Sequence, residues 1–299
     1  MYDLIIVGAG PAGLTSALYA SRAGVKTLIL ERGAPGGKVF TTHLVENYPG
    51  LESITGRDLS MQMHKHALKF GAVYEYGDVE AITKKADTFI VKTNMQEYSG
   101  KKVILATGTE NRKLGVQGEE EFLGKGVSYC AVCDGNFFKN QDVAVVGGGN
   151  SALEEALYLA DLCKSVTIIH RREEFRAEQY IIDKLKGKEN IKYELNAQVQ
   201  EIVGEQKVQS VKLKYKDKTT KELAISGIFI YVGLIPLTQR FQNFNIYNEG
   251  KNIKVDKKMA TEIEGLYSAG DVNVKSLRQI ATAVNDGAQA AQSVIEALK

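Results

Sequence analysis

The chain has 299 residues, a formal net charge of +2 at pH 7 and 25% charged residues. Its hydrophobic fraction of 44% is ordinary for a folded globular protein and argues against a disordered chain. The balanced charge excludes nucleic-acid or membrane binding through bulk charge, and no apolar run reaches the roughly 18 residues that a membrane-spanning helix needs. No basic region precedes the first apolar run, so a signal peptide is not expected. Three cysteines are too few for a disulfide framework and favour a reducing compartment, the cytoplasm.

The first 31 residues predict a strand–helix–strand unit. Residues 4–7 form an apolar run typical of a buried parallel strand, residues 12–22 predict a helix, and residues 27–30 predict a second strand. Between strand and helix lies GAGPAG, a G-x-G-x-x-G pattern over residues 8–13. Its glycines permit a tight turn, the approach of a pyrophosphate and close helix packing, and Glu31 follows where a carboxylate binds a ribose hydroxyl. We therefore predict a dinucleotide site here, against the alternative of a glycine-rich turn without a ligand.

A second copy of the unit begins 139 residues further on. An apolar strand over 143–146 is followed by GGGNSA over 147–152, a predicted helix over 151–163 and a strand over 165–169. Two copies of one nucleotide-binding unit predict an α/β fold with two Rossmann-like nucleotide-binding domains.

Two polar, glycine-containing segments, 108–118 and 232–241, are the expected crossings between these domains. A chain that leaves the first domain and later re-enters it makes the second domain an insertion. We therefore predict a discontinuous first domain of residues 1–112 and 243–299, and an inserted domain of residues 113–242.

The two units differ at the end of the second strand. Where the first unit has a carboxylate, the second has HRR over residues 170–172, with Arg176 four residues on. Guanidinium groups bind a 2′-phosphate through charge-assisted hydrogen bonds, whereas a carboxylate repels it. The pattern favours NADPH over NADH. The alternative is a solvated basic turn that pairs with the two glutamates that follow it.

Cys130 and Cys133 form a C-x-x-C pair, and Asp134 follows directly. Two thiols at this spacing can close a small disulfide ring and undergo exchange, and a neighbouring carboxyl group can carry the proton that moves. The alternative is half of a zinc site, which requires four ligands. No second C-x-x-C exists, and His64 and His66 diverge on a helix, so we predict a redox pair and no metal site.

A third segment of interest is AGDV over residues 269–272, which follows an apolar run and precedes RQI over 278–280. Asp271 at this place is suited to hold a second part of the first nucleotide. The alternative is an aspartate that only caps a helix.

Together these features resemble the low-molecular-weight thioredoxin reductases of the bacterial type, over essentially the whole chain. The most specific matches are CAVCD over 130–134, GGGNSA over 147–152, the HRR segment with Arg176, and AGDV over 269–272. The resemblance implies the class II pyridine nucleotide-disulfide oxidoreductase architecture, with FAD in the first domain, NADPH in the inserted domain, and a homodimer. It also implies thioredoxin-disulfide reductase activity, in which electrons pass from NADPH to FAD, to the Cys130–Cys133 disulfide, and to thioredoxin or a thioredoxin-like protein.

The resemblance further implies roles for single residues. Cys133 would stack on the flavin, Cys130 would attack the disulfide of thioredoxin, and Asp134 would be the acid–base group. The residues implied for FAD are Gly8, Gly10, Pro11, Ala12, Glu31, Arg32, Gly36, Gly37, Lys38, Asn47, Val79, Ala106, Thr107, Gly108, Gly270, Asp271, Arg278, Gln279 and Ile280. Those implied for NADPH are Gly147, Gly149, Asn150, Ser151, Glu154, His170, Arg171, Arg172 and Arg176.

One residue departs from the family pattern. Lys38 follows the glycine pair, where the family commonly has glutamine. A cation near the flavin favours its anionic reduced form and makes a strict NADPH preference less secure. Two alternatives to the reductase are kept: the flavoprotein of an alkyl hydroperoxide reductase, which carries an extra N-terminal redox domain, and a non-catalytic flavin redox sensor. Ferredoxin–NADP reductases share the two-domain plan but lack the cysteine pair, so Cys130 and Cys133 argue against them.

Overall fold

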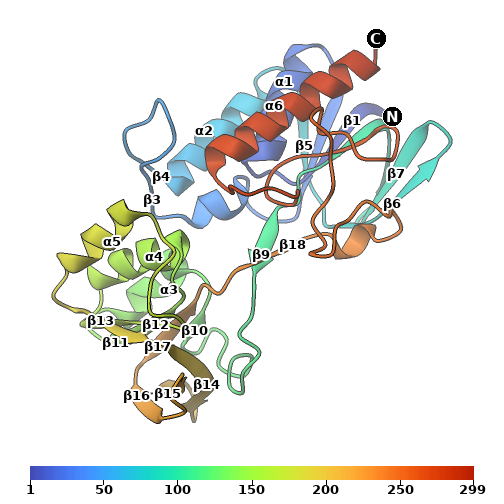
Figure 1. Cartoon of the computed structure of the whole chain (residues 1–299). Helices are drawn as coiled ribbons and strands as arrows, with labels where there is room; N and C mark the ends of the chain where they lie inside the picture. The colour runs from blue at the N-terminus through green and yellow to red at the C-terminus, as the bar shows by residue number, and fades with distance from the viewer. The chain divides into compact units, whose positions relative to one another are not determined.

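The structure, a computed structural model, describes residues 1–299 and divides into two compact units. Unit 1 comprises Met1–Glu110 and Pro236–Lys299, and unit 2 comprises Asn111–Ile235 (Figure 1). The division falls at 110 and 236 instead of 112 and 243, because the segment after Pro236 packs within unit 1. Phe241 lies in a core cluster of that unit, and Arg240 Nη1 donates to the carbonyl of Val79 at 3.0 Å.

Unit 1 is built around a seven-stranded sheet in the order β5-β2-β1-β8-β7-β6, with β19 paired to β8. The strands β1, β2, β5, β8 and β19 run parallel, whereas β6 and β7 form antiparallel pairs. The bounds are β1 (Tyr2–Val7), β2 (Thr27–Glu31), β5 (Val73–Tyr76), β6 (Val79–Lys85), β7 (Thr88–Thr93), β8 (Glu97–Leu105) and β19 (Leu266–Ser268). The helices are α1 (Pro11–Arg22), α2 (Gly56–Leu68) and α6 (Ile280–Ala297), with short 3₁₀ turns η1 (Gly37–Thr41) and η3 (Gln239–Phe241) and a small hairpin β3 (Leu44–Val45) and β4 (Ile54–Thr55).

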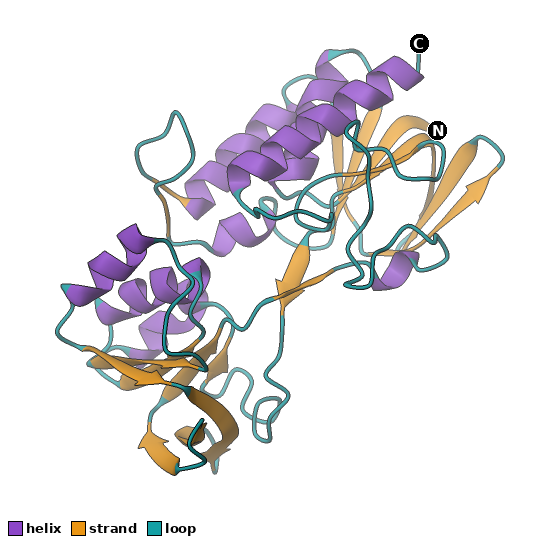
Figure 2. Cartoon of the chain, viewed as in Figure 1, coloured by secondary structure: helices purple, strands orange, loops and turns teal.

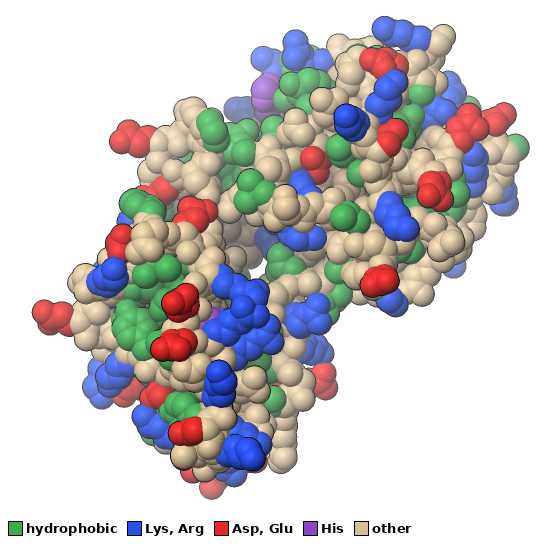
Figure 3. All heavy atoms as spheres, viewed as in Figure 1, with side chains coloured by type: hydrophobic (Ala, Val, Ile, Leu, Met, Phe, Trp, Pro, Cys, Tyr) green, Lys and Arg blue, Asp and Glu red, His purple; other side chains and the backbone are tan.

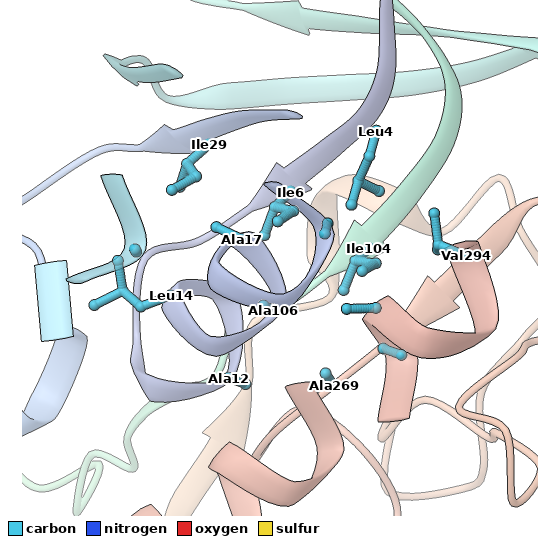
Figure 4. Packing of buried hydrophobic residues seen from close by; sticks show 14 of the residues in the cluster. Leu4, Ile6, Ala12, Leu14, Ala17, Ile29, Ile104, Ala106, Ala269 and Val294 are labelled. Atoms are coloured by element: carbon cyan, nitrogen blue, oxygen red, sulfur yellow. The ribbon is translucent and has the colours of Figure 1, made fainter. Parts of the chain in front are cut away.

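Alternate residues of β1 supply the two faces of this sheet. Leu4 and Ile6 point to the side covered by α1 and α6, where Figure 4 shows Ile6 beside Ala17 of α1 and Val294 of α6 on the side of Leu4. Ile5 and Val7 point to the other side and join a separate apolar cluster. A strand with both faces covered has no polar face, which explains the continuous apolar run in the sequence.

Unit 2 has a five-stranded parallel sheet in the order β10-β17-β11-β12-β13 and a three-stranded antiparallel sheet, β14-β15-β16. The parallel strands are β10 (Val127–Ser128), β11 (Asp142–Val146), β12 (Ser165–His170), β13 (Ile191–Leu195) and β17 (Gly227–Ile230). The antiparallel strands are β14 (Ala197–Gly204), β15 (Val208–Tyr215) and β16 (Thr220–Ala224). The helices are α3 (Ala131–Asp134), α4 (Asn150–Ala160) and α5 (Gln179–Lys186), with the 3₁₀ turn η2 (Gly135–Phe138) (Figure 2).

The same alternation organises unit 2. Val143 and Val145 of β11 pack with Leu159 of α4, whereas Ala144 and Val146 pack with the three-stranded sheet. Both units therefore place a glycine turn and a helix directly after a buried parallel strand. The predicted α/β fold with two Rossmann-like units is confirmed. The helix that follows the second glycine turn, α4, ends at residue 160 instead of the predicted 163. The chain passes from one unit to the other at β9 (Thr109–Asn111) and β18 (Leu234–Pro236), which pair with each other. No helix of the chain combines the length and apolar character needed to cross a membrane.

Candidate active site

The glycine turn of unit 1 is fixed by packing at two positions and open at the third. A Cβ on Gly8, whose φ is +105°, would lie 2.4 Å from the carbonyl oxygen of Ala106. A Cβ on Gly13 would lie 1.9 Å from the carbonyl oxygen of Gly8, so α1 and the turn approach too closely for any side chain. Around Gly10 a Cβ would meet nothing within 4 Å. The middle glycine therefore leaves backbone exposed beside the N-terminus of α1, which suits a pyrophosphate.

Glu31, the last residue of β2, braces this turn. Its Oε2 accepts a hydrogen bond from the backbone N–H of Ala9 at 2.7 Å, and its Oε1 accepts one from Gly33 at 2.8 Å. The carboxylate thus links the glycine turn to the loop after the strand and lines the adjoining cleft.

The cleft of unit 1 consists of two adjoining pockets that share Gly8, Glu31, Arg32, Thr107 and Leu237. The first, which we call the β5 pocket, is also lined by Gly77, Asp78, Val79, Glu110, Gln239, Arg240 and Phe241. The second, which we call the α6 pocket, is also lined by Gly10, Pro11, Ala12, Gly37, Lys38, Val39, Ala106, Gly108, Thr109, Ala269, Gly270, Asp271, Gln279, Ile280 and Ala283. Most of the residues expected to bind FAD are therefore brought together in one place.

Three of those residues lie outside the pocket walls. The loop at Gly36 packs on α2, where a Cβ would lie 2.1 Å from Ser60 Oγ. Asn47 donates its amide to Gln279 Oε1 at 3.2 Å, and the Arg278 guanidinium donates to the carbonyl of Asp271 at 3.3 Å. Arg278 and Asn47 therefore hold pocket residues in position.

The α6 pocket contains an aspartate with one oxygen that has no hydrogen-bond partner. Asp271 Oδ1 is buried and has no hydrogen bond in the structure, and burial raises the pKa of this carboxyl group. Such an atom is costly unless a ligand satisfies it. The orphan carboxylate, the open backbone at Gly10 and the helix N-terminus fit the ribityl and pyrophosphate groups of FAD.

The glycine turn of unit 2 repeats this design. A Cβ on Gly147 would lie 2.5 Å from the carbonyl oxygen of Tyr231, whereas around Gly149 a Cβ would meet nothing within 4 Å. Asn150, at the start of α4, donates to Glu178 Oε1 at 2.8 Å and accepts from the Glu178 backbone N–H at 2.9 Å. The turn is thus packed on one side and open on the other, as a dinucleotide requires.

The basic segment after β12 is held beside this turn. The backbone N–H of Arg176 donates to the carbonyl of Gly148 at 2.7 Å, and the side chains of Arg171 and Arg172 are exposed. Lys and Arg side chains gather on one face of unit 2 in Figure 3. The exposed guanidinium groups fit a 2′-phosphate.

His170 has a different environment from its arginine neighbours. Only 7% of it is exposed, its Nε2 lies 3.1 Å from the carbonyl oxygen of Glu174, and burial lowers its pKa. Its ring also fills the space beside Gly148, where a Cβ would lie 2.4 Å from His170 Cε1. The imidazole therefore supports the glycine turn by packing against Gly148.

The cysteine pair lies at the start of α3 in unit 2. Cys130 and Cys133 are joined by a disulfide with Cα atoms 5.3 Å apart, and Cys130 Sγ accepts a hydrogen bond from the Cys133 N–H at 3.1 Å. Ser128 Oγ donates to Asp134 Oδ2 at 2.6 Å and accepts from the Cys130 N–H at 3.0 Å. Asp134 is thereby tied to the backbone of the redox pair. The third cysteine, Cys163, is free and buried.

Sequence reasoning missed three residues around this pair. Ser128 connects Asp134 to Cys130, and the Tyr231 hydroxyl accepts from the Ala131 N–H at 2.9 Å. Glu155 of α4 has a buried Oε2 without a hydrogen bond, and burial raises its pKa to about 8. None of the three belongs to a motif. Tyr231 directly follows β17, the strand between β10 and β11, so only the strand order places it here.

Comparison with known proteins agrees with this geometry. The family model for pyridine nucleotide-disulphide oxidoreductases matches residues 2–287, which defines the class of protein. A thioredoxin reductase of Listeria innocua is 49% identical over 304 residues, covering 100% of this chain and 95% of the relative. That of Bacillus subtilis is 48% identical over 298 residues, covering 98% and 94%. The crystal structure of Lactococcus lactis thioredoxin reductase, in its FR conformation, has a TM-score of 0.98 at 46% identity and covers 99% of this chain and 98% of that one.

Within that class of oxidoreductases, the chain belongs to the thioredoxin reductase family. The resemblance predicted from the sequence motifs is therefore confirmed.

Proposed function

We propose that the protein is an NADPH-dependent thioredoxin-disulfide reductase that contains FAD. The observation that carries this proposal is the Cys130–Cys133 disulfide, with Asp134 tied to it through Ser128, inside a unit that also has a dinucleotide turn. A second dinucleotide cleft in unit 1 supplies the place for the flavin. Together these sites support a reductase that handles two nucleotides and one dithiol.

In unit 1 the pyrophosphate of FAD would lie at the turn of Gly8 and Gly10, and Glu31 would hold the adenosine ribose. Asp271 would accept a hydrogen bond from the ribityl chain, which would satisfy its orphan oxygen. FAD, when bound, accepts a hydride and passes an electron pair to a disulfide. The remaining FAD residues of the two pockets shape the cleft and exclude water.

In unit 2 the open backbone at Gly149 would receive the pyrophosphate of NADPH. Arg171, Arg172 and Arg176 would surround the 2′-phosphate. Ser151 and Glu154 lie on the first turns of α4, directly after the glycine turn. The exposed guanidinium groups are free to form charge-assisted hydrogen bonds, which distinguishes NADPH from NADH.

The dithiol then carries electrons to the protein substrate. The Cys130 thiolate attacks the disulfide of thioredoxin and forms a mixed disulfide, and Cys133 attacks Cys130 to release reduced thioredoxin. Asp134 supplies the proton that the leaving thiolate takes up. Over one cycle NADPH and one proton reduce one substrate disulfide to two thiols and leave NADP⁺.

The substrate is thus thioredoxin or a thioredoxin-like protein, and we extend the proposal to a cytoplasmic homodimer. The cytoplasm is supported by the redox chemistry, since a reducing compartment keeps such a pair cycling. The homodimer is the arrangement implied by the family resemblance.

The test is a pair of measurements on the purified flavoprotein. Under anaerobic conditions, NADPH should bleach the flavin absorbance, and a subsequent addition of oxidised thioredoxin should restore it. In the steady state, NADPH should be consumed in proportion to thioredoxin disulfide. Flavin bleaching without turnover on a panel of thioredoxin-like proteins would contradict the proposal and favour the redox sensor. A double variant, Cys130→Ser with Cys133→Ser, is the matched control and should bleach without turnover.

A further inference from the structure

Lys38 places an ammonium group at the wall of the α6 pocket. It is the second residue of η1, directly after Gly36 and Gly37, whose φ values are +106° and +57°. Lys38 Nζ donates to Thr109 Oγ1 at 2.6 Å, and Thr109 itself is buried. The ammonium group is therefore anchored at one position, while the side chain stays open to the pocket.

The order of groups along the cleft identifies what this pocket receives. Glu31 marks the adenosine ribose, and the glycine turn marks the pyrophosphate. The β5 pocket lies at the ends of β2 and β5, beyond Glu31, where the adenine would continue. The flavin half of the dinucleotide then extends from the pyrophosphate in the other direction. That direction is the α6 pocket, which Lys38 lines together with Asp271.

Of the other cations near this pocket, Arg32 is exposed beside Glu31 and lines both pockets, whereas Arg278 and Lys275 have partners. Arg278 donates to the backbone carbonyls of Asp271 and Lys275, each at 3.3 Å. Lys275 forms an ion pair with Asp286 at 2.6 Å. The only hydrogen-bond partner of the Lys38 ammonium group is the neutral hydroxyl of Thr109. Beside Asp271, Lys38 therefore carries the charge that a ligand meets without a bonded counter-ion, while Arg32 lies next to Glu31.

The charged groups that face Lys38 are Asp271, Arg278 and Glu110. Burial by the pocket walls lowers the pKa of Lys38 to about 8, the effect of Arg278 adds to this, and the two carboxylates oppose it. The surroundings therefore destabilise an ammonium group in the unliganded pocket. A ligand that gains negative charge there would relieve this cost.

We propose that Lys38 sets the reduction potential of the flavin in unit 1, by stabilising the negative charge that the isoalloxazine acquires with a hydride. The inference rests on the FAD site of the proposed function. A hydride from NADPH carries two electrons and one proton, leaves NADP⁺, and adds one negative charge to the neutral oxidised ring. A fixed cation beside the ring favours that product over the oxidised form. Lys38 thus determines how readily this chain's flavin is reduced, whichever donor supplies the hydride.

The test uses the purified holoprotein and two readouts that do not require turnover. Lys38→Gln and Lys38→Met remove the charge, Lys38→Arg keeps it, and Lys65→Gln removes an exposed lysine of α2 as the matched control. For each protein we would first measure bound FAD per chain. We would then measure the midpoint potential of the flavin and the dissociation constant for sulfite. Sulfite is an anion that adds to oxidised flavins and leaves the ring negatively charged.

We expect Lys38→Gln and Lys38→Met to disfavour reduction about tenfold, which is ~30 mV for a two-electron couple, and to weaken sulfite binding by a similar factor. Lys38→Arg and Lys65→Gln should leave the equilibrium constant for flavin reduction and the dissociation constant for sulfite within twofold of the wild-type values. Full FAD content with an unchanged potential in the neutral variants would overturn the inference and leave the proposed function intact. An apoprotein in all variants, Lys65→Gln included, would instead count against the FAD site itself.

If only the neutral Lys38 variants lose FAD, the pH dependence of the midpoint potential of the wild-type protein tests the inference instead. Reduction would raise the affinity of Lys38 for its proton, so the midpoint potential should fall more steeply with pH above about 8 than below it. A constant slope between roughly pH 7 and 9.5 would overturn the inference.

Discussion

Ser128 offers a direct test of how the redox pair is held. The side chain is buried, with 4% exposed, and its hydroxyl both donates to Asp134 at 2.6 Å and accepts from the Cys130 N–H at 3.0 Å. Ser128→Ala removes both hydrogen bonds without adding bulk. The Cys130 N–H and the Asp134 carboxylate then lose their shared partner.

The expected magnitude follows from the two bonds. A hydrogen bond to a charged group contributes about 1.5–3 kcal/mol and a neutral one about 1 kcal/mol, so the free energy of unfolding should fall by about 2.5–4 kcal/mol if nothing relaxes. The same loss frees Asp134 from the backbone of the cysteine pair. Since about 1.4 kcal/mol corresponds to a factor of ten in rate, we expect kcat for thioredoxin to fall at least tenfold.

The assay separates the two half-reactions. Flavin bleaching by NADPH should keep its wild-type rate, because Ser128 contacts neither nucleotide turn. Reduction of thioredoxin should slow, and urea unfolding should report the loss of stability. Thr220→Ala removes an exposed hydroxyl of the same unit and serves as the control. A folded Ser128→Ala protein with normal thioredoxin turnover, or one that slows both half-reactions equally, would refute the reasoning.

Three further outcomes are expected. Replacing Cys130 or Cys133 with serine should preserve FAD binding and abolish thioredoxin reduction, because exchange needs both sulfurs; the Cys130 variant should also show a long-wavelength absorbance band. Replacing Arg171 and Arg172 with glutamine should raise KM for NADPH far more than for NADH, and equal changes would show that the 2′-phosphate lies elsewhere. Burial raises the pKa of Glu155 from its ordinary 4.5 to about 8, so the folded protein retains a proton that the unfolded chain releases. The free energy of unfolding should therefore fall as pH rises from about 4.5 through 8, and Glu155→Gln should flatten this part of the profile in pH-dependent urea titrations.

The fold was predictable because its signal is local and repeated. A buried strand, a glycine turn and a helix occur in one stretch of about 30 residues, and the chain contains that stretch twice. The cysteine pair and Asp134 are likewise contiguous in sequence. A prediction made from such segments needs no knowledge of how distant strands pair.

The support around the redox pair was not predictable for the opposite reason. Tyr231 lies 100 residues after Ala131, to which it hydrogen-bonds, and they meet because β17 lies between β10 and β11. Glu155 shares a helix with predicted nucleotide residues, but its burial depends on how α4 packs against its neighbours. Serine two residues before a cysteine is not a motif. These contacts are set by tertiary packing, which leaves no periodicity or spacing in the sequence.

The two nucleotide turns show how one design yields two electrostatic environments. Glu31 and His170 are the last residues of equivalent strands, and each braces its glycine turn: Glu31 through backbone N–H groups at 2.7 and 2.8 Å, His170 by packing under Gly148. In unit 1 the Glu31 carboxylate that supports the turn also carries the negative charge that repels a 2′-phosphate. In unit 2 the brace is a buried imidazole with a lowered pKa, and the charge comes from the exposed arginines that follow it. Exchanging Glu31 for arginine would therefore remove one hydrogen bond from the turn and one from the loop after β2 before it created a phosphate site. Nucleotide preference in this fold is divided between the residue that supports the turn and its neighbours, and it cannot be transferred by changing either alone.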